Sequence, residues 1–126
     1  MVVDWNCGSS GFGDMKRKKV LLTRPALEIV AARFRALSDA SRLQILQNLF
    51  NGERSVQELC ELTSMSQANV SKHLSVLAEQ GIVEKRRQGL FVYYSIGDST
   101  IYELCDIVCG AVGKRYGQVM KEFSGR

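Results

Sequence analysis

Two cysteines four residues apart, Cys105 and Cys109, carry the most distinctive chemistry in this sequence of 126 residues. On a helix, side chains at this spacing share one face, with Cβ atoms about 5–6 Å apart. A pair of thiolates is the kind of ligand that soft metal ions prefer. Thiols can also form disulfide or polysulfide links. Because a buried cysteine behaves as a small apolar residue and Cys105 falls on an apolar stripe, a purely structural role for that residue stays open.

A second group of residues, within 66–96, has the character of a nucleic-acid-binding surface. At 100° per residue, Val70, Leu74 and Leu77 share one apolar side of a helix, and small polar residues share the other. Such a face can approach a DNA groove closely, and the first turn of a helix is a site for phosphate. A basic run, 85–87, follows in a hairpin. The candidate DNA contacts are Ser66, Gln67, Ala68, Asn69, Ser71, Lys72, His73, Arg86 and Arg87.

The elements that position these groups follow from apolar spacing and capping residues. Pro25 fits the first turn of a helix, Ser38 or Asp39 can cap a second, and Ser55 with Glu58 forms a capping box. Gly81 ends a helix, and the apolar period then falls to two. We expect helices over about 25–37, 39–50, 55–62, 66–80 and 98–117, the last capped by Asp98, and strands over 82–87 and 90–96. The predicted fold is mainly α with a small β-hairpin, a winged helix-turn-helix.

Charge and composition set the domain organisation. Lys and Arg number 17 against 13 Asp and Glu, and the run 16–19 alone accounts for the net charge of +4. We expect a flexible basic arm over 1–19, one folded domain over 20–117 and a tail over 118–126. No apolar stretch is long enough for a membrane span, and the N-terminus lacks a secretory signal. The expectation is a cytoplasmic protein with reduced cysteines.

Three segments of the sequence resemble the ArsR/SmtB family of small winged-helix repressors, the arsenic and metal sensors of bacteria. They read LSDASRLQIL, ERSVQELCEL and SQANVSKHLSVLAEQGIVEKRRQGLFVYYSI, and the similarity runs from about Ala32 to Leu104. The resemblance implies a homodimer held by the first and last helices. It also implies that double-stranded operator DNA is bound by the fourth helix, over about 66–80, and by the hairpin, over 82–96. These two elements are the recognition helix and the wing. The resemblance further implies release of DNA when an inducer binds.

The inducer sites of this family differ between members, and two types can be compared with this chain. One type has an ELCxC pair helped by cysteines of the N-terminal arm; here Cys60 matches its first cysteine, Leu62 replaces the second, and Cys7 lies on the arm. The other type binds zinc between subunits through aspartate and histidines of the last helix. Asp98 fits its first position, but no histidine follows His73, so zinc is the less favoured ion.

We therefore expect a repressor that leaves its operator when a soft metal or metalloid ion binds cysteine thiolates. Cys105 and Cys109 supply two ligands, a third comes from Cys60, Cys7 or the partner subunit, and arsenite is the best guess for the ion. The fold itself requires no cofactor. One alternative is a thiol-redox or persulfide-responsive repressor of the same fold. Another is a winged-helix protein-interaction module without specific DNA binding.

His73 is the only histidine, and its role has to be chosen among three. As a catalyst it would need a nucleophile and an orienting partner, and no such pattern surrounds it, so the chain is not expected to be an enzyme. As a metal ligand it lacks a second histidine or a cysteine at zinc-finger spacing. The matching histidine of the family lies at the recognition helix, which favours a contact with DNA or with the scaffold.

Overall fold

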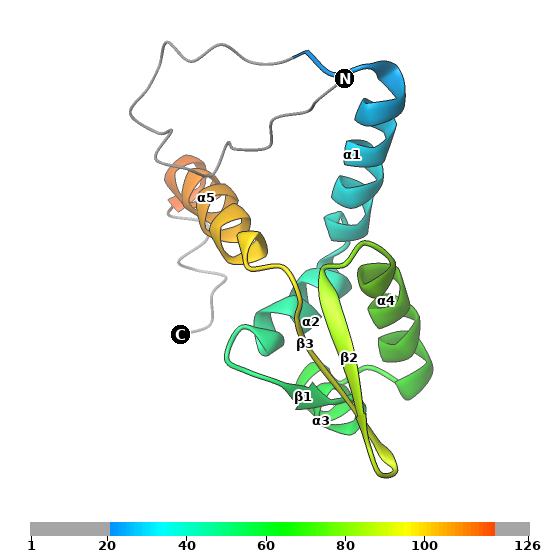
Figure 1. Cartoon of the computed structure of the whole chain (residues 1–126). Helices are drawn as coiled ribbons and strands as arrows, with labels where there is room; N and C mark the ends of the chain where they lie inside the picture. Colours follow the sequence, from blue (N-terminus) through cyan, green and yellow to red (C-terminus); the bar gives the residue numbers. More distant parts are fainter. Residues whose placement is uncertain (1–20, 118–126) are drawn as a thin grey trace.

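The structure is a computed structural model, and residues 21–117 are described (Figure 1). The predicted arm over 1–19, the tail over 118–126 and Cys7 lie outside this range. The elements run in the order α1 (Arg24–Leu37), α2 (Ala40–Leu49), β1 (Arg54–Ser55), α3 (Val56–Thr63), α4 (Gln67–Glu79), β2 (Val83–Gln88), β3 (Phe91–Ile96) and α5 (Thr100–Arg115). This order confirms the winged helix-turn-helix that the sequence predicts.

Side-chain oxygens begin four of the helices. The capping box of α3 is complete, because Ser55 Oγ accepts from the amide of Glu58 at 3.1 Å and Glu58 Oε1 accepts from the amide of Ser55 at 2.8 Å. The residues at the N-cap positions of the four helices are Thr23, Asp39, Ser55 and Ser66. These local bonds satisfy amides that have no partner within a helix, and so they set where each helix starts.

The start of α5 differs slightly from the prediction. Ser99 occupies the N-cap position and makes no side-chain capping bond. The predicted cap, Asp98, lies one residue earlier, where its Oδ1 atom accepts from the amide of Thr100 at 3.0 Å. Asp98 therefore still satisfies a free amide of the first turn, although from a different position.

The sheet has one strand that the sequence does not predict. Its order is β1-β3-β2, all antiparallel, and the two-residue strand β1 pairs Arg54 with Tyr94 and Ser55 with Tyr93. A segment of two residues is too short to show an alternating pattern, so only tertiary pairing reveals it. The expected hairpin is confirmed, with Gly89 at φ 61° in its turn, a conformation that suits glycine.

The buried core lies among α2, α3, α4 and one face of the sheet. Its apolar members are Ala36, Ile45, Leu46, Leu49, Leu59, Val70, Leu74, Leu77, Ile82, Val83, Tyr94 and Ile101. Helix α1 contributes only Ala36 to this set, and α5 contributes only Ile101. Both helices project from the packed part of the chain in the direction opposite to the hairpin tip (Figure 1).

The projecting helices leave large apolar side chains in contact with solvent. Ile29 and Phe34 of α1 are 71% and 57% exposed, and Ile107 and Val108 of α5 are 49% and 50% exposed. Several large apolar side chains exposed on the same two helices are typical of a surface that contacts another protein. It lies on the two helices through which the sequence resemblance implies dimerisation. Within residues 21–117, no helix has the length and apolar content needed to cross a membrane.

The capping box of α3 leads to a stability prediction. Ser55→Ala removes a buried capping hydroxyl, and we expect it to lower the free energy of unfolding by about 1 kcal/mol. Ser99→Ala is the matched control, because Ser99 stands at an N-cap position but caps nothing. Urea unfolding at one fixed protein concentration measures both changes. Equal losses in the two variants would contradict the assignment of the cap.

Candidate nucleic-acid interface

Helices α3 and α4 are joined by a tight corner that turns α4 outward. Ser64 ends α3 in the left-handed region at φ 60°, Met65 packs against the core, and Ser66 Oγ accepts from the amide of Asn69 at 3.1 Å to begin α4. This three-residue connection fits the short turn of a helix-turn-helix.

Helix α4 has one fully buried side and one exposed side, as its periodicity predicts. Val70, Leu74 and Leu77 have no exposed surface. The predicted contact residues Ser66, Gln67, Ala68, Asn69, Ser71 and Lys72 are all exposed. The structure therefore brings six of the nine candidate residues onto one accessible surface of small polar side chains and one positive charge.

His73 lies at the edge of this surface and contacts the scaffold. Its Nδ1 atom is 3.2 Å from Arg42 Nη1, and the same guanidinium donates to the carbonyl of Ala36 at 2.6 Å and to that of Arg35 at 3.2 Å. Because arginine has only donors, Nδ1 is the acceptor in this bond. His73 is half-buried and links α4, through Arg42, to α2 and to the end of α1. These contacts favour a contact with the scaffold as its role.

The hairpin divides the basic run 85–87 between two faces. Lys85 pairs with Tyr94 and Arg87 pairs with Val92, so both basic residues lie on the face that the helices cover. Arg86 pairs with Tyr93 on the opposite face. Strand β2 is also the strand that packs against α4. Lys85, which was not among the predicted contacts, therefore joins Arg87 beside the recognition helix, and Arg86 points away from them.

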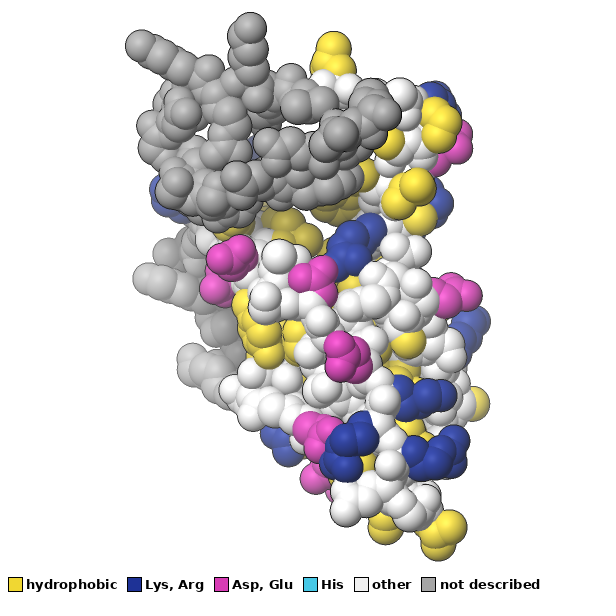
Figure 2. All heavy atoms as spheres, viewed as in Figure 1, with side chains coloured by type: hydrophobic (Ala, Val, Ile, Leu, Met, Phe, Trp, Pro, Cys, Tyr) yellow, Lys and Arg dark blue, Asp and Glu magenta, His cyan; other side chains and the backbone are white. Residues whose placement is uncertain are grey.

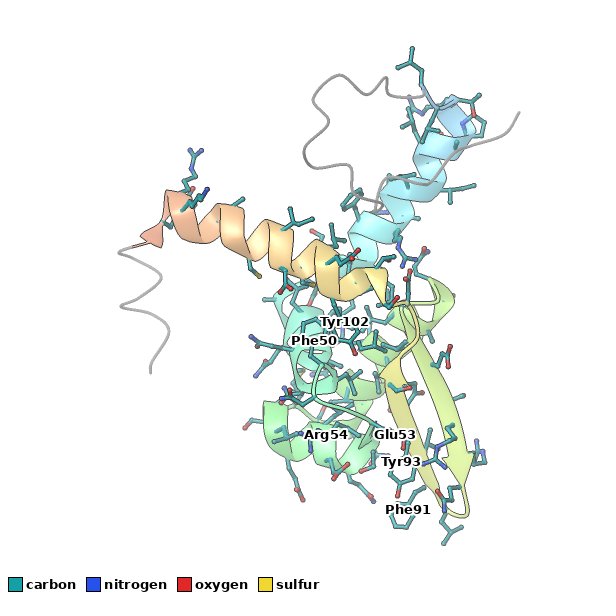
Figure 3. The ribbon with its side chains drawn as sticks, turned by 60° about the vertical axis from the view of Figure 1, so that its left-hand side comes forward. Phe50, Glu53, Arg54, Phe91, Tyr93 and Tyr102 are labelled. Atoms are coloured by element: carbon teal, nitrogen blue, oxygen red, sulfur yellow. The ribbon has the colours of Figure 1, made fainter. Side chains whose placement is uncertain are left out.

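Arg86 is held by neighbours that the sequence reasoning missed. Its Nη2 and Nε atoms contact the two carboxylate oxygens of Glu53 at 2.8 and 2.9 Å, its Nη1 atom donates to Gln88 at 2.7 Å, and the guanidinium lies 4.9 Å from the Tyr93 ring centroid. Figure 3 shows Glu53, Tyr93 and Phe91 in a row along the same side of the hairpin. No local pattern could reveal Glu53, because it lies 33 residues from Arg86.

The ion pair changes the electrostatics of the wing. The hydrogen bonds from Arg86 lower the pKa of the Glu53 carboxyl below its ordinary value of 4.5, and Glu53 in turn raises the pKa of Arg86. The two charges cancel over a short distance, so Arg86 adds little to the positive potential of the hairpin. Among residues 21–117, Lys85 and Arg87 form no salt bridge, and Lys and Arg side chains gather over the hairpin half of the molecule (Figure 2).

The cysteines of the described chain do not form a three-ligand site in one subunit. Cys60 on α3 and Cys105 on α5 are half-buried against the core, and Cys109 is exposed. Residues 21–117 contain no group of three His, Cys, Asp or Glu placed to hold a metal ion. Burial, followed by the nearby Cys109 and Asp106, raises the pKa of the Cys105 thiol above its ordinary value of 9.0. The α5 pair therefore offers at most two thiolates from this part of a subunit.

Asp98, the position that fits a zinc ligand of the family, has other partners. Its carboxylate pairs with Arg33 and accepts from the hydroxyl of Thr100 at 2.7 Å. The hydrogen bonds from Thr100 are the main reason that the pKa of Asp98 lies below its ordinary value of 3.8, and the Arg33 charge adds to them. These residues do not fit a zinc site of that type.

A helix-turn-helix with a polar recognition helix beside a basic hairpin defines a winged helix-turn-helix DNA-binding protein. Residues 39–85 match the bacterial regulatory protein arsR family. The chain is 40% identical over 92 residues to the probable mercury resistance operon repressor of Streptomyces lividans, covering 73% of this chain and 72% of that protein. It is 36% identical over 96 residues to the HTH-type transcriptional regulator NmtR of Mycobacterium tuberculosis, covering 76% of this chain and 80% of that one.

A solved structure with the same fold supports this assignment. The homodimeric winged helix-turn-helix DNA-binding domain of Mb0332 from Mycobacterium bovis, a possible ArsR-family regulator, has a TM-score of 0.68 and 34% identity, covering 77% of this chain and 93% of that domain. The chain belongs to the ArsR family. It is thus a member of a family of transcriptional regulators, not an enzyme.

The division of the basic run gives a prediction for DNA binding. Arg87→Ala removes an unpaired charge beside α4, so we expect weaker binding to specific and random DNA and a plot of log K against log salt that is shallower by about 0.9. Arg86→Gln is the matched comparison and should change this slope less, because Glu53 already neutralises Arg86. Fluorescence anisotropy across a salt series measures both. A larger slope change in Arg86→Gln would contradict the assignment.

The Glu53–Arg86 pair gives a separate pH prediction. Because pairing lowers the folded-state pKa of Glu53, its contribution to stability is present above pH 4.5 and is lost as the pH falls through that lowered value. An NMR titration of the Glu53 carboxyl should show a midpoint below 4.5 in the natural protein and a higher midpoint in Arg86→Ala. An unchanged midpoint in Arg86→Ala would contradict the assignment of this pair.

Proposed function

We propose that this chain is a homodimeric transcriptional repressor that binds operator DNA through α4 and the wing and leaves it when a soft ion binds the thiols of α5. The observation that carries the DNA-binding part is the exposed polar side of α4, with the unpaired charges of Lys85 and Arg87 beside it. Gln67, Asn69 and Lys72 reach base edges or phosphates, and the wing residues contact the flanking backbone. As a bacterial DNA-binding regulator, it acts in the cytoplasm.

The homodimer rests on the apolar faces of α1 and α5. In one subunit these helices add only Ala36 and Ile101 to the core and leave Ile29, Phe34 and Val108 largely exposed. A second copy that packs on these faces buries them, and the Mb0332 domain is described as homodimeric. Two recognition helices related by a two-fold axis then face half-sites that are about 34–36 Å apart on one side of the duplex.

The inducer site is proposed at Cys105 and Cys109, one turn apart on α5. Cys105 is half-buried beside Leu104, where a bound ion alters the packing of α5, and Cys109 is exposed, where an ion can enter. A third thiolate comes from Cys7, Cys60 or the partner subunit if the ion is trigonal. Arsenite is the proposed ion, because two thiolates suit a soft ion. Mercury(II) is the main alternative, because a relative is named for mercury resistance.

Release of DNA follows because the proposed site lies on α5, one of the two helices that hold the dimer together. A shift of α5 changes the separation of the two recognition helices, so both lose register with their half-sites at once. A coupling free energy of about 1–3 kcal/mol would lower operator affinity about 5- to 150-fold. For a divalent ion, the affinity of the α5 site for the ion should rise with pH. The pKa of the Cys105 thiol is raised, and this thiol must lose its proton before the ion binds.

Gel-shift titration with the chain's own upstream DNA tests this proposal. We expect arsenite or mercury(II) to release DNA from the natural protein, and Cys105→Ser with Cys109→Ser to abolish release without changing affinity for DNA in the absence of ions. Ala111→Ser, also on α5, is the control for a change in helix surface. Separate Cys60→Ser and Cys7→Ser variants identify the third ligand.

Three outcomes would contradict the proposal in different ways. Unchanged release in the double serine variant would move the sensor away from α5. Release by an oxidant or a persulfide donor, with no release by arsenite, cadmium, zinc, copper(I) or mercury(II), would favour the redox alternative. Binding that is equally weak for all DNA sequences would instead favour a protein-interaction module.

A further inference from the structure

Arg33 joins three elements at the point where the DNA-binding part of the molecule meets the projecting helices. The residue lies on α1. Its Nη1 atom donates to the carbonyl of Gln80, the C-cap residue of α4, at 2.7 Å, and its Nη2 atom pairs with Asp98, just before α5. The side chains of Arg33 and Asp98 are each 32% exposed, so this ion pair is shielded more than a surface pair.

Both ends of this link are fixed to helix termini. Asp98 Oδ1 accepts from the amide and the hydroxyl of Thr100, the first residue of α5, at 3.0 and 2.7 Å. At the other end, a basic group beside the last carbonyls of α4 has favourable charge for a helix C-terminus. A displacement at the start of α5 therefore reaches the end of the recognition helix through one side chain.

Apolar packing fixes α5 only weakly within its own subunit. Ile101 is its one fully buried residue in the described chain, and Cys105 is half-buried. Tyr102 adds a ring contact with Phe50 at a centroid distance of 5.0 Å (Figure 3). Because these apolar contacts are few, they do not fix the direction of α5 by themselves. The hydrogen-bonded link at Arg33 therefore contributes much of what fixes the angle between α5 and α4.

We propose that Arg33 is a positioning residue that sets the angle between the recognition helix and the last helix, and so determines which half-site spacing the dimer accepts. This inference rests on the proposed dimeric repressor. In that dimer, α1 and α5 hold the two subunits together. Any variation in the angle between α5 and α4 therefore changes the distance between the two recognition helices. A loose joint would let the dimer bind operators of unequal spacing.

The test measures spacing selectivity, which a loss of stability alone does not change. The natural protein selects an inverted repeat from random DNA, and anisotropy titrations then measure binding to that repeat with its spacer unchanged, one base pair longer and one shorter. The variants are Arg33→Gln and Asp98→Asn. Arg24→Gln on the same helix is the control, because its ion pair with Glu28 is exposed at 83% and 65%.

We expect the natural protein and Arg24→Gln to lose about 10-fold in affinity for either altered spacer, in the range of one poorly fitted base-pair contact. Arg33→Gln should bind the selected repeat about 10-fold more weakly, lose less than about 3-fold on spacer change, and keep its affinity for random DNA, since its phosphate contacts are intact. Asp98→Asn should change the same affinities in the same direction by a smaller amount, because its amide oxygen can still accept a hydrogen bond from Arg33.

The outcomes separate this inference from the proposed function. If the natural protein selects no inverted repeat, the dimeric repressor itself is wrong. If it selects one, but Arg33→Gln and Asp98→Asn keep the spacing profile of the natural protein, only the role of Arg33 is overturned. An equal loss on all three spacers together with random DNA also overturns it, because that pattern reports general weakening.

Discussion

The buried side of α4 is the constraint on which the functional surface depends. Val70, Leu74 and Leu77 lose all contact with water among α2, α3 and the sheet, and each buried side chain of this size stabilises the fold by about 1.5–3 kcal/mol. A helix that must bury this stripe has only one rotation about its axis. The same rotation directs Gln67 and Lys72 outward, so the core packing and the DNA-facing surface are two results of one requirement.

Polar links connect this packed unit to the two helices that project from it. Arg42 ties the end of α1 to α2 and to His73 of α4, and Arg33 ties α1 to the end of α4 and to Asp98. The apolar core does not extend far along α1 or α5. The part that reads DNA is therefore rigid in itself, and its relation to the dimer helices depends on a few hydrogen bonds. That division suits the proposed repressor, in which binding of an ion on α5 moves the two recognition helices together.

The three adjacent basic residues of the wing have different surroundings. Three adjacent basic residues appear equivalent in the chain, yet strand geometry places Lys85 and Arg87 beside α4 and places Arg86 over Tyr93, where Glu53 neutralises it. A bidentate carboxylate pair with an aromatic ring beside it fixes the Arg86 side chain on the hairpin. Arg86 thus supports the wing, and its neighbours supply the unpaired charge.

The sequence by itself determined the features that depend on neighbours along the chain. Local capping and period predict the helix starts at Ser55 and Ser66, the stop at Gly81 and the two sides of α4, because these interactions span only a few residues. They leave Ser38 and Asp39 open as the cap of α2, and the structure places the cap at Asp39. The i, i+4 spacing of Cys105 and Cys109 belongs to the same class. Only the tertiary structure decided the strand β1, the Glu53 partner of Arg86 and the Arg33 bridge. Each of these joins residues that are far apart in sequence, and their pairing is set by how the packed helices and strands meet in space.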